Sequence, residues 1–161
     1  MSDYSLDLDI GADNVPQTSD DYYTPRWIFE GLGLEFDIDP CQPIGGISWI
    51  PAKTHYTILS DGLRQDWGGG RVWMNPPFSN TNPWVRKFMN HGNGVCLVPT
   101  AKAKWFNEVW DQADGALMLP SNMEFTTRTD YDKGIFIATV LFAFGADNVA
   151  ALHRLNIGRV R

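Results

Sequence analysis

The sequence predicts an α/β domain whose sheet is mostly parallel and closes with antiparallel strands. Short apolar segments typical of strands alternate with amphipathic segments of about 10 residues typical of helices, an order that gives parallel strands. Near the end of the chain, two predicted strands follow one another without a helix between them, which favours antiparallel pairing. The 161 residues are enough for one domain with its own hydrophobic core.

The first predicted helix covers residues 24–33. Thr24 is a favourable N-cap, and Pro25 suits the first helical position because the missing N–H is not needed there. Gly33 suits the position that ends a helix, since glycine adopts the left-handed conformation at little cost. The residues before this helix, 1–20, are rich in Asp, Ser and Gly and lack a period, so we expect a flexible N-terminal arm followed by one domain over residues 21–161.

A short strand is predicted over residues 35–39, where apolar and acidic residues alternate until Pro40. Residues 40–60 are irregular, with a short helix or strand expected only near residues 56–59. The next strand is predicted over residues 71–74 because an apolar run stops there at two prolines, which cannot continue a central strand.

The middle of the chain predicts a helix and a buried strand. Residues 82–91 carry large apolar side chains at helical spacing, and Gly92 follows as a helix end. Residues 94–99 form a nearly continuous apolar run, which is typical of a strand that is covered on both faces. These two segments therefore predict a helix packed beside the centre of the sheet.

The last third of the chain contains the remaining predicted elements. Residues 102–113 have an aromatic face and predict an amphipathic helix, which residues 116–119 follow as a strand. Residues 123–127 and 135–144 alternate or are apolar throughout, and we expect them to pair as a closing hairpin. A short final element is expected over residues 149–155.

Composition excludes several classes of protein. The formal net charge of −6 argues against a protein that coats nucleic acid through bulk positive charge. No apolar run approaches the roughly 20 residues that a membrane span needs. The two cysteines, Cys41 and Cys96, give no disulfide framework and favour a cytoplasmic location. The three histidines are scattered without ligand spacing, so we expect no metal site.

The segment Asn75-Pro76-Pro77-Phe78 has residues suited to activating an exocyclic amine. Such an amine is a weak nucleophile because its lone pair is delocalised into the ring. The Asn75 side-chain oxygen and the Pro76 carbonyl can each accept one of its N–H protons, with Pro77 holding the carbonyl in place. A flat ring at Phe78 can stack on the base. In isolation, the same segment is also compatible with a simple turn that ends a strand.

This segment resembles the (D/N/S)PP(Y/F/W) signature of amino-group methyltransferases that use S-adenosylmethionine. The wider order of motifs resembles the phage-type, Dam-like DNA N6-adenine methyltransferase family. The matching segments are Tyr23-Thr24-Pro25, Phe36-Asp37-Ile38-Asp39, Asp61-Gly62-Leu63 with Trp67, Val72 to Asn80, and Trp84-Val85-Arg86-Lys87. The resemblance covers most of residues 20–145 and implies a Rossmann-like fold, an S-adenosylmethionine cofactor, and DNA with a flipped adenine as the substrate.

The resemblance also assigns roles to individual positions. It implies that Asn75, Pro76, Pro77 and Phe78 form the catalytic pocket. The residues that it places against the cofactor are Thr24, Pro25, Asp39, Pro40, Cys41 and Asp61. A carboxylate at a strand end, as at Asp39, can accept from the amino group of the cofactor and balance its positive sulfonium. The family implies a phage origin and a location in the host cytoplasm, and leaves the oligomeric state open.

Two features keep other functions open. The glycine-rich cofactor loop that such enzymes usually carry is missing, which favours a methyltransferase-like binding module that has lost its cofactor. The low isoelectric point, about 4.9, leaves RNA adenine or a protein glutamine as alternative methyl acceptors, since related sites act on both. We expect no separate target-recognition domain within these 161 residues, so the loops at residues 79–83 and 121–134 are the expected DNA contacts.

Overall fold

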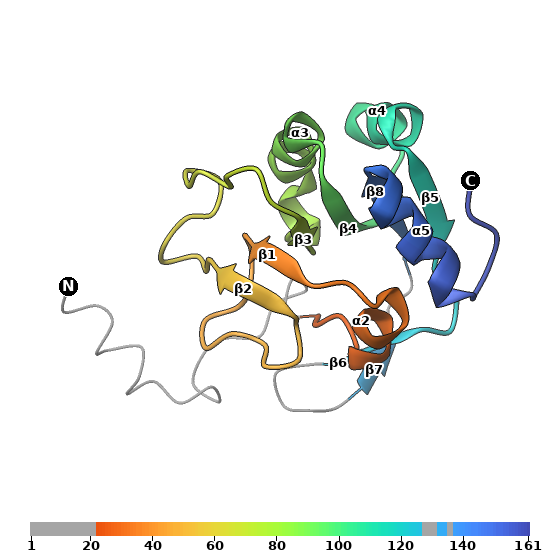
Figure 1. The fold of residues 1–161 in the computed structure, drawn as a ribbon, viewed down its shortest axis with the longest axis horizontal. Helices are drawn as coiled ribbons and strands as arrows, with labels where there is room; N and C mark the ends of the chain where they lie inside the picture. Colours follow the sequence, from red (N-terminus) through yellow and green to blue (C-terminus); the bar gives the residue numbers. More distant parts are fainter. Residues whose placement is uncertain (1–21, 127–131, 135–136) are drawn as a thin grey trace.

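The computed structural model describes residues 22–126, 132–134 and 137–161, and the predicted arm over residues 1–20 lies outside them. A six-stranded sheet has the order β2-β1-β3-β4-β8-β5, and a second sheet pairs β6 with β7 (Figure 1). The strands are β1 (Phe36–Asp39), β2 (Ala52–His55), β3 (Val72–Met74), β4 (Gly94–Pro99), β5 (Gly115–Met118), β6 (Glu124–Thr126), β7 (Asp132–Gly134) and β8 (Thr139–Phe144). The helices are α2 (Arg26–Leu32), the short 3-10 helix η2 (Phe78–Asn80), α3 (Thr81–His91), α4 (Lys104–Gln112) and α5 (Ala146–Leu155).

The main sheet is parallel over most of its width. β2, β1, β3 and β4 pair in parallel, and β8 runs antiparallel to both of its neighbours, β4 and β5. The predicted fold class, a Rossmann-like and mostly parallel sheet with an antiparallel closing strand, is confirmed. The antiparallel strand lies inside the sheet rather than at its edge.

Alternation along the strands divides the core into two layers. Trp73, Val95 and Leu97 face a cluster that includes α2 and α5. Their neighbours along the strands, Met74 and Cys96 among them, face a second cluster that includes α3 and α4. Because successive side chains of a strand point to opposite faces, the continuous apolar run of β4 is buried along its whole length, as predicted. The result is a three-layer α/β/α domain (Figure 1).

Helix ends agree with the predicted caps at their C-termini. Gly33 ends α2 and Gly92 ends α3, with φ values of 63° and 76° that suit glycine. The prediction for the start of the first helix is wrong by one residue. Pro25, and not Thr24, is the N-cap of α2, and Thr24 is fully buried. The hydroxyl of Thr24 has a different partner, which is described with the site below.

Two further predictions are wrong. Residues 123–127 were expected to pair with residues 135–144, but β6 pairs with β7 and β8 inserts between β4 and β5. In this position β8 pairs with β4 over six residues. Residues 135–136, at the start of the predicted strand, lie outside the described residues. The expected element near residues 56–59 is a turn, and the strand of this region is β2, directly before it.

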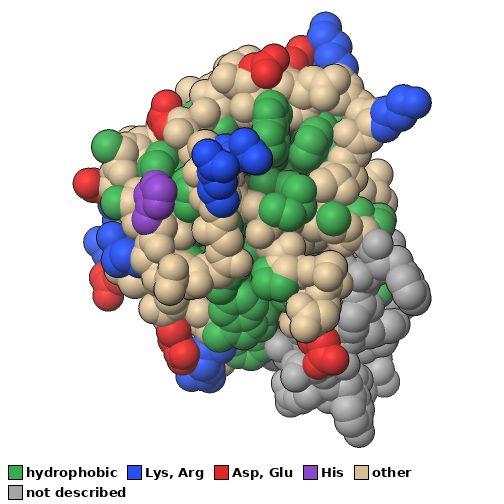
Figure 2. All heavy atoms as spheres, turned by 90° about the vertical axis from the view of Figure 1, so that its right-hand side faces the viewer, with side chains coloured by type: hydrophobic (Ala, Val, Ile, Leu, Met, Phe, Trp, Pro, Cys, Tyr) green, Lys and Arg blue, Asp and Glu red, His purple; other side chains and the backbone are tan. Residues whose placement is uncertain are grey.

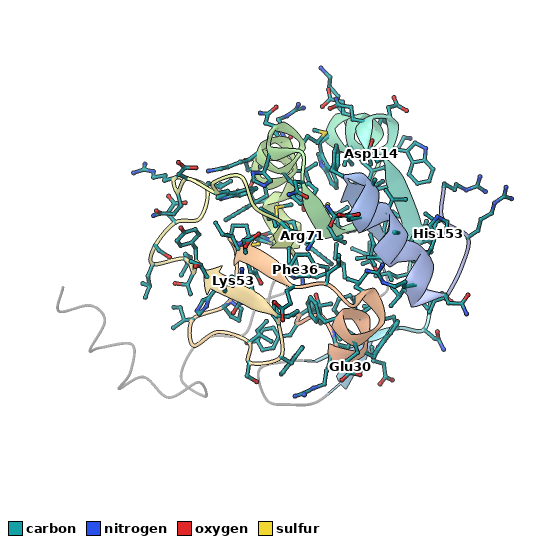
Figure 3. The ribbon with its side chains drawn as sticks, viewed as in Figure 1. Glu30, Phe36, Lys53, Arg71, Asp114 and His153 are labelled. Carbon is teal, nitrogen blue, oxygen red and sulfur yellow. The ribbon has the colours of Figure 1, made fainter. Side chains whose placement is uncertain are left out.

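A polar cluster fixes the amino-terminal end of β3, opposite the site edge. The Arg71 side chain donates to Asn148 Oδ1 over 2.7 Å, and Asn148 Nδ2 donates to Asn93 Oδ1 over 2.8 Å. Asn148 is buried, and Arg71 lies beside the first strand near Phe36 (Figure 3). These bonds connect α5 to the residue before β3 and to the residue before β4.

The surface carries charges of both signs. On the side that bears α5, β5 and the C-terminus, hydrophobic side chains gather near the middle, with acidic and basic side chains scattered around them (Figure 2). Trp110 on α4 and Met118 on β5 are among the exposed large hydrophobic residues of the chain. Among the described residues, no helix is long and apolar enough to cross a membrane.

Candidate active site

The two polar segments singled out in the sequence meet at one edge of the main sheet. β1 pairs with β2 on one side and with β3 on the other, so the strand order reverses between β1 and β3. Ligands of open α/β sheets bind outside the carboxyl ends of the strands at such a reversal. Asp39 ends β1 and Asn75 directly follows β3, and both line one cavity of about 380 Å³.

The cavity brings together most of the predicted site residues. Those in its lining are Asp39, Pro40, Cys41, Asp61, Asn75 and Pro77. Thr24, Pro25, Pro76 and Phe78 lie outside this lining. The lining therefore combines four of the positions predicted to bind the cofactor with two of the positions predicted to be catalytic.

The ionisable side chains of the cavity lining are acidic. Asp39 and Asp61 supply two carboxylates, and the described lining contains no Lys, Arg or His. Aromatic side chains, including Tyr22 and Trp84, supply flat apolar surface. Carboxylates and aromatic faces both favour a cation over an anion. The cavity thus fits a ligand that combines positive charge with apolar rings. Among the described residues, no group of metal-ligating side chains is present.

Asp39 is the buried acidic group of the site, with 2% of its surface exposed. Its Oδ1 accepts the backbone N–H of Cys41 over 3.2 Å. Burial raises the pKa of the Asp39 carboxyl from its ordinary value of 3.8 to about 7, although hydrogen bonds from Cys41 and from the Gln42 side chain oppose the rise. The carboxyl is therefore poised to lose its proton when a positive charge is placed beside it.

Cys41 connects the two strand ends. Its thiol donates to the backbone carbonyl of Asn75 over 3.2 Å. Burial and the neighbouring Asp39 raise the pKa of the Cys41 thiol well above its ordinary value, so the thiol remains a neutral donor. The predicted binding residue thus holds the end of β1 against the end of β3.

The Asn75 side chain is held by the segment before α2. Its Nδ2 donates to the backbone carbonyl of Tyr22 over 3.2 Å and to Thr24 Oγ1 over 3.1 Å. Within the described residues, both hydrogen bonds of this amide are made by its nitrogen. Oδ1 is left to accept from a ligand, which is the role predicted for a residue that activates an amine.

Thr24 and Pro25 lie next to the site but outside the cavity lining. The Thr24 carbonyl accepts the indole N–H of Trp49 over 2.8 Å. Pro25 begins α2 and lines a separate hollow beside Met123. Both residues are predicted to lie against the cofactor, whereas their contacts in this fold are with Asn75 and with neighbouring segments.

Of the remaining residues of the motif, Pro77 also lines the cavity, whereas Pro76 and Phe78 lie outside its lining. Pro76 is buried, and the Pro77 carbonyl accepts the N–H of Asn80 over 3.1 Å as η2 begins. Phe78 is half-buried and lines a second groove, of about 380 Å³, with Thr100 and Trp105. The motif therefore forms a wall with Asn75 towards the cavity and Phe78 towards the groove.

The loop before β3 closes the cavity from the side of α3. Asp61 has a positive φ of 52° and an ion pair with Arg64 at 3.3 Å. The indole N–H of Trp67 donates to the Gly62 carbonyl over 2.8 Å. Lys87 donates to the Leu63 carbonyl over 2.8 Å, with its ammonium 4.8 Å from the centre of the Trp67 ring. Lys87 is therefore a structural cation that holds this loop on α3.

Several lining residues were not identified from the sequence. They are Tyr22, Tyr23, Gln42, Pro43, Ile47, Ile50, Thr57, Ile58, Gly62, Trp73 and Trp84. Most are apolar or aromatic, so nothing in the sequence distinguishes them from core residues. For Gln42 and Pro43, the sequence did contain an indication that they line the site, because they directly follow the Asp39-Pro40-Cys41 segment.

Comparison with known proteins agrees with the resemblance drawn from the motifs. A sequence model of the family described as DNA N-6-adenine-methyltransferase (Dam) matches residues 12–134, which is more than half of the chain. A curated relative, the DNA N-6-adenine-methyltransferase of Haemophilus phage HP1 (strain HP1c1), is 30% identical over 94 residues, covering 52% of this chain and 53% of the relative. The chain thus spans about half the length of this relative. The residues that match the family model include Asp39 and the whole Asn75 to Phe78 segment, and the chain belongs to the DNA N-6-adenine-methyltransferase (Dam) family.

Proposed function

We propose that this chain transfers a methyl group from S-adenosylmethionine to the N6 amine of an adenine in DNA. The observation that carries the proposal is the convergence of Asp39 and Asn75 on one cavity at the switch point of the sheet. Membership of the family and the name of the phage relative support the same reaction. A host-cytoplasmic location is a further expectation, taken from the phage relative.

The cavity supports S-adenosylmethionine as the cofactor. This cofactor carries a sulfonium and an ammonium, and it would supply an activated methyl group. Asp39 and Asp61 are the carboxylates that would hold it, with Asp39 accepting from the amino group and Asp61 from ribose hydroxyls. Pro40 and the Cys41 backbone would bound it at the end of β1. The acidic side chains and the aromatic lining of the cavity support this assignment.

The other half of the site belongs to the base. Asn75 Oδ1 and the Pro76 carbonyl would accept the two N6 protons and leave the nitrogen lone pair free to form the new bond to carbon. Phe78 would stack on the flipped base from the groove that it lines with Trp105. Lys102 and Lys104 are exposed near this groove and would meet phosphate groups.

The direct test is transfer of a labelled methyl group to DNA, RNA and protein in parallel. We expect label in DNA, recovered as N6-methyladenine after digestion to nucleosides. If label were recovered only in RNA adenine or in protein glutamine, the methyl transfer would stand as proposed but its substrate would not be DNA. Absence of transfer together with absence of cofactor binding by a folded protein would instead identify a methyltransferase-like binding module.

The pKa of Asp39 predicts that cofactor affinity depends on pH. A cation beside Asp39 lowers the pKa of this carboxyl from about 7, so the complex binds fewer protons than the free protein. Affinity should therefore rise with pH, by up to about tenfold per unit, until pH passes about 7 and then level off. Calorimetric titration of S-adenosylmethionine from about pH 5.5 to about pH 8.5 measures this slope, because this range brackets the pKa of Asp39.

Asp39→Asn provides the control for this pH dependence. It should bind the cofactor weakly and with little dependence on pH. In the absence of cofactor, the wild-type free energy of unfolding should fall as pH rises from about 4 to about 7, because the folded state holds the proton that the unfolded state loses near 3.8. Asp39→Asn should lack this fall. If the affinity for S-adenosylmethionine depended equally on pH in the wild type and in Asp39→Asn, the proposed role of Asp39 would be contradicted.

A further inference from the structure

We propose that Thr24 is a positioning residue, which holds the Asn75 amide in the orientation that presents its oxygen to the methyl acceptor. This inference rests on the proposed methyl transfer, because it concerns the residue that binds the acceptor amine. It assigns to Thr24 a role other than contact with the cofactor. Thr24 lies outside the cavity lining and bonds directly to Asn75.

The Asn75 amide can have only one orientation against its partners. One of its two acceptors is the backbone carbonyl of Tyr22, which cannot donate a hydrogen bond. The group that faces this carbonyl is therefore the amide nitrogen, with its two protons. Through its second proton, Nδ2 donates a hydrogen bond to Thr24 Oγ1 over 3.1 Å. With both protons used on one side, the other end of the amide is Oδ1.

Thr24 is itself held in place. It is fully buried, with 0% of its surface exposed. Its backbone carbonyl accepts the indole N–H of Trp49 over 2.8 Å, and the residue that follows it is Pro25, whose ring fixes the backbone before α2. A Thr side chain has few rotamers, so the hydroxyl has a defined position. Trp49, Thr24 and Asn75 thus form a chain of contacts from the loop before β2 to the motif after β3.

The Tyr22 carbonyl selects the orientation in which the amide is an acceptor towards the base, and the Thr24 contact holds the amide in that orientation. If the amide turned over, its N–H groups would face the N–H groups of the adenine amine, and neither could bond. Loss of the Thr24 hydroxyl removes one of the two hydrogen bonds that fix the amide and leaves it held by the Tyr22 carbonyl alone. The expected defect is therefore in the turnover number rather than in cofactor affinity, since Thr24 does not line the cofactor cavity.

The test compares Thr24→Val with Thr24→Ser in the full chain. Valine keeps the shape and removes the acceptor, whereas serine keeps the acceptor. We expect Thr24→Val to lower kcat by about tenfold, the effect of one lost neutral hydrogen bond on a barrier. Thr24→Ser should retain kcat near the wild-type value, and the dissociation constant for S-adenosylmethionine should be similar in all three proteins. Thr139→Val, at a buried threonine of β8 outside the cavity, controls for the loss of a buried hydroxyl.

Two readouts separate positioning from a general loss of structure. In an Asn75→Ala background, Thr24→Val should have almost no further effect on kcat, because the group that it positions is gone. In nuclear magnetic resonance spectra, one Asn75 side-chain amide proton should move upfield in Thr24→Val and stay in Thr24→Ser. This second readout needs neither cofactor nor activity.

The outcomes distinguish this inference from the proposed function. Wild-type transfer to DNA with an unchanged kcat in Thr24→Val would overturn the inference and leave the function standing. An equal loss of kcat from Thr24→Val in the presence and absence of Asn75 would also overturn it. If the wild type transfers no methyl group, the proposed function fails. The amide resonances then decide the inference alone, and unchanged Asn75 signals in Thr24→Val would overturn it.

Discussion

Asn75→Ala is expected to lower kcat for methyl transfer to DNA by about 100- to 1,000-fold, the range observed when one preorganised polar group is removed from a reacting centre. Asn75 directly follows β3, and its amide is held by Tyr22 and Thr24. Its oxygen is therefore in place before the base arrives, and alanine removes that acceptor. Affinity for S-adenosylmethionine should change much less, because Asp39 and Asp61 remain in the cavity.

Rates with labelled cofactor and calorimetric binding measure these two quantities separately. Asn90→Ala is the matched control, since Asn90 is an exposed residue of α3 outside the cavity. It should leave both kcat and affinity at wild-type values. If Asn75→Ala kept a kcat within about tenfold of the wild type, the loss would be that of an ordinary hydrogen bond. The amide could then not be the group that activates the amine.

Gly62→Ala is expected to damage both the fold and the cofactor cavity. A Cβ at this position would lie 1.9 Å from the Pro40 carbonyl oxygen and 2.9 Å from its carbon. Both atoms belong to the backbone at the end of β1, so a side chain cannot simply rotate away. The loop cannot move freely either, because Lys87 holds it on α3 and the Trp67 indole donates to the Gly62 carbonyl.

The clash should lower the free energy of unfolding by about 2–3 kcal/mol. For a chain of this size, that corresponds to a Tm about 4–12 °C lower. Displacement of Pro40 should also weaken binding of S-adenosylmethionine by at least about tenfold, or about 1.4 kcal/mol. Thermal unfolding followed by calorimetric titration below the Tm measures both effects.

Gly69→Ala is the control on the same loop. A Cβ at Gly69 would meet no atom within 4 Å, and its backbone does not need a positive φ. This variant should keep the wild-type Tm and affinity. Equal behaviour of the two alanine variants would contradict the close packing of the loop on Pro40, and with it the role of Gly62 in shaping the cavity.

Local chemistry predicted most elements of this fold. The two prolines after Asn75 ended β3 where expected, because a residue without N–H cannot continue a central strand. Gly33 and Gly92 ended their helices for a similar local reason. The pairing of the last strands was not predicted correctly. Nothing within residues 135–144 says that β8 must lie between β4 and β5, because that choice depends on the partners available across the whole sheet.

The site shows the same division between local and distant information. By itself, the sequence determined that Asp39 and Asn75 would stand at strand ends and that the motif would stop β3 with an amide. Only the tertiary structure decided that Cys41 would join these strand ends, that Lys87 would hold a loop, and that Thr24 would bond to Asn75 across 51 positions of the chain. The physical reason is that φ restrictions and hydrophobic periods act over a few residues, whereas a hydrogen bond between distant segments exists only after the sheet has brought them together.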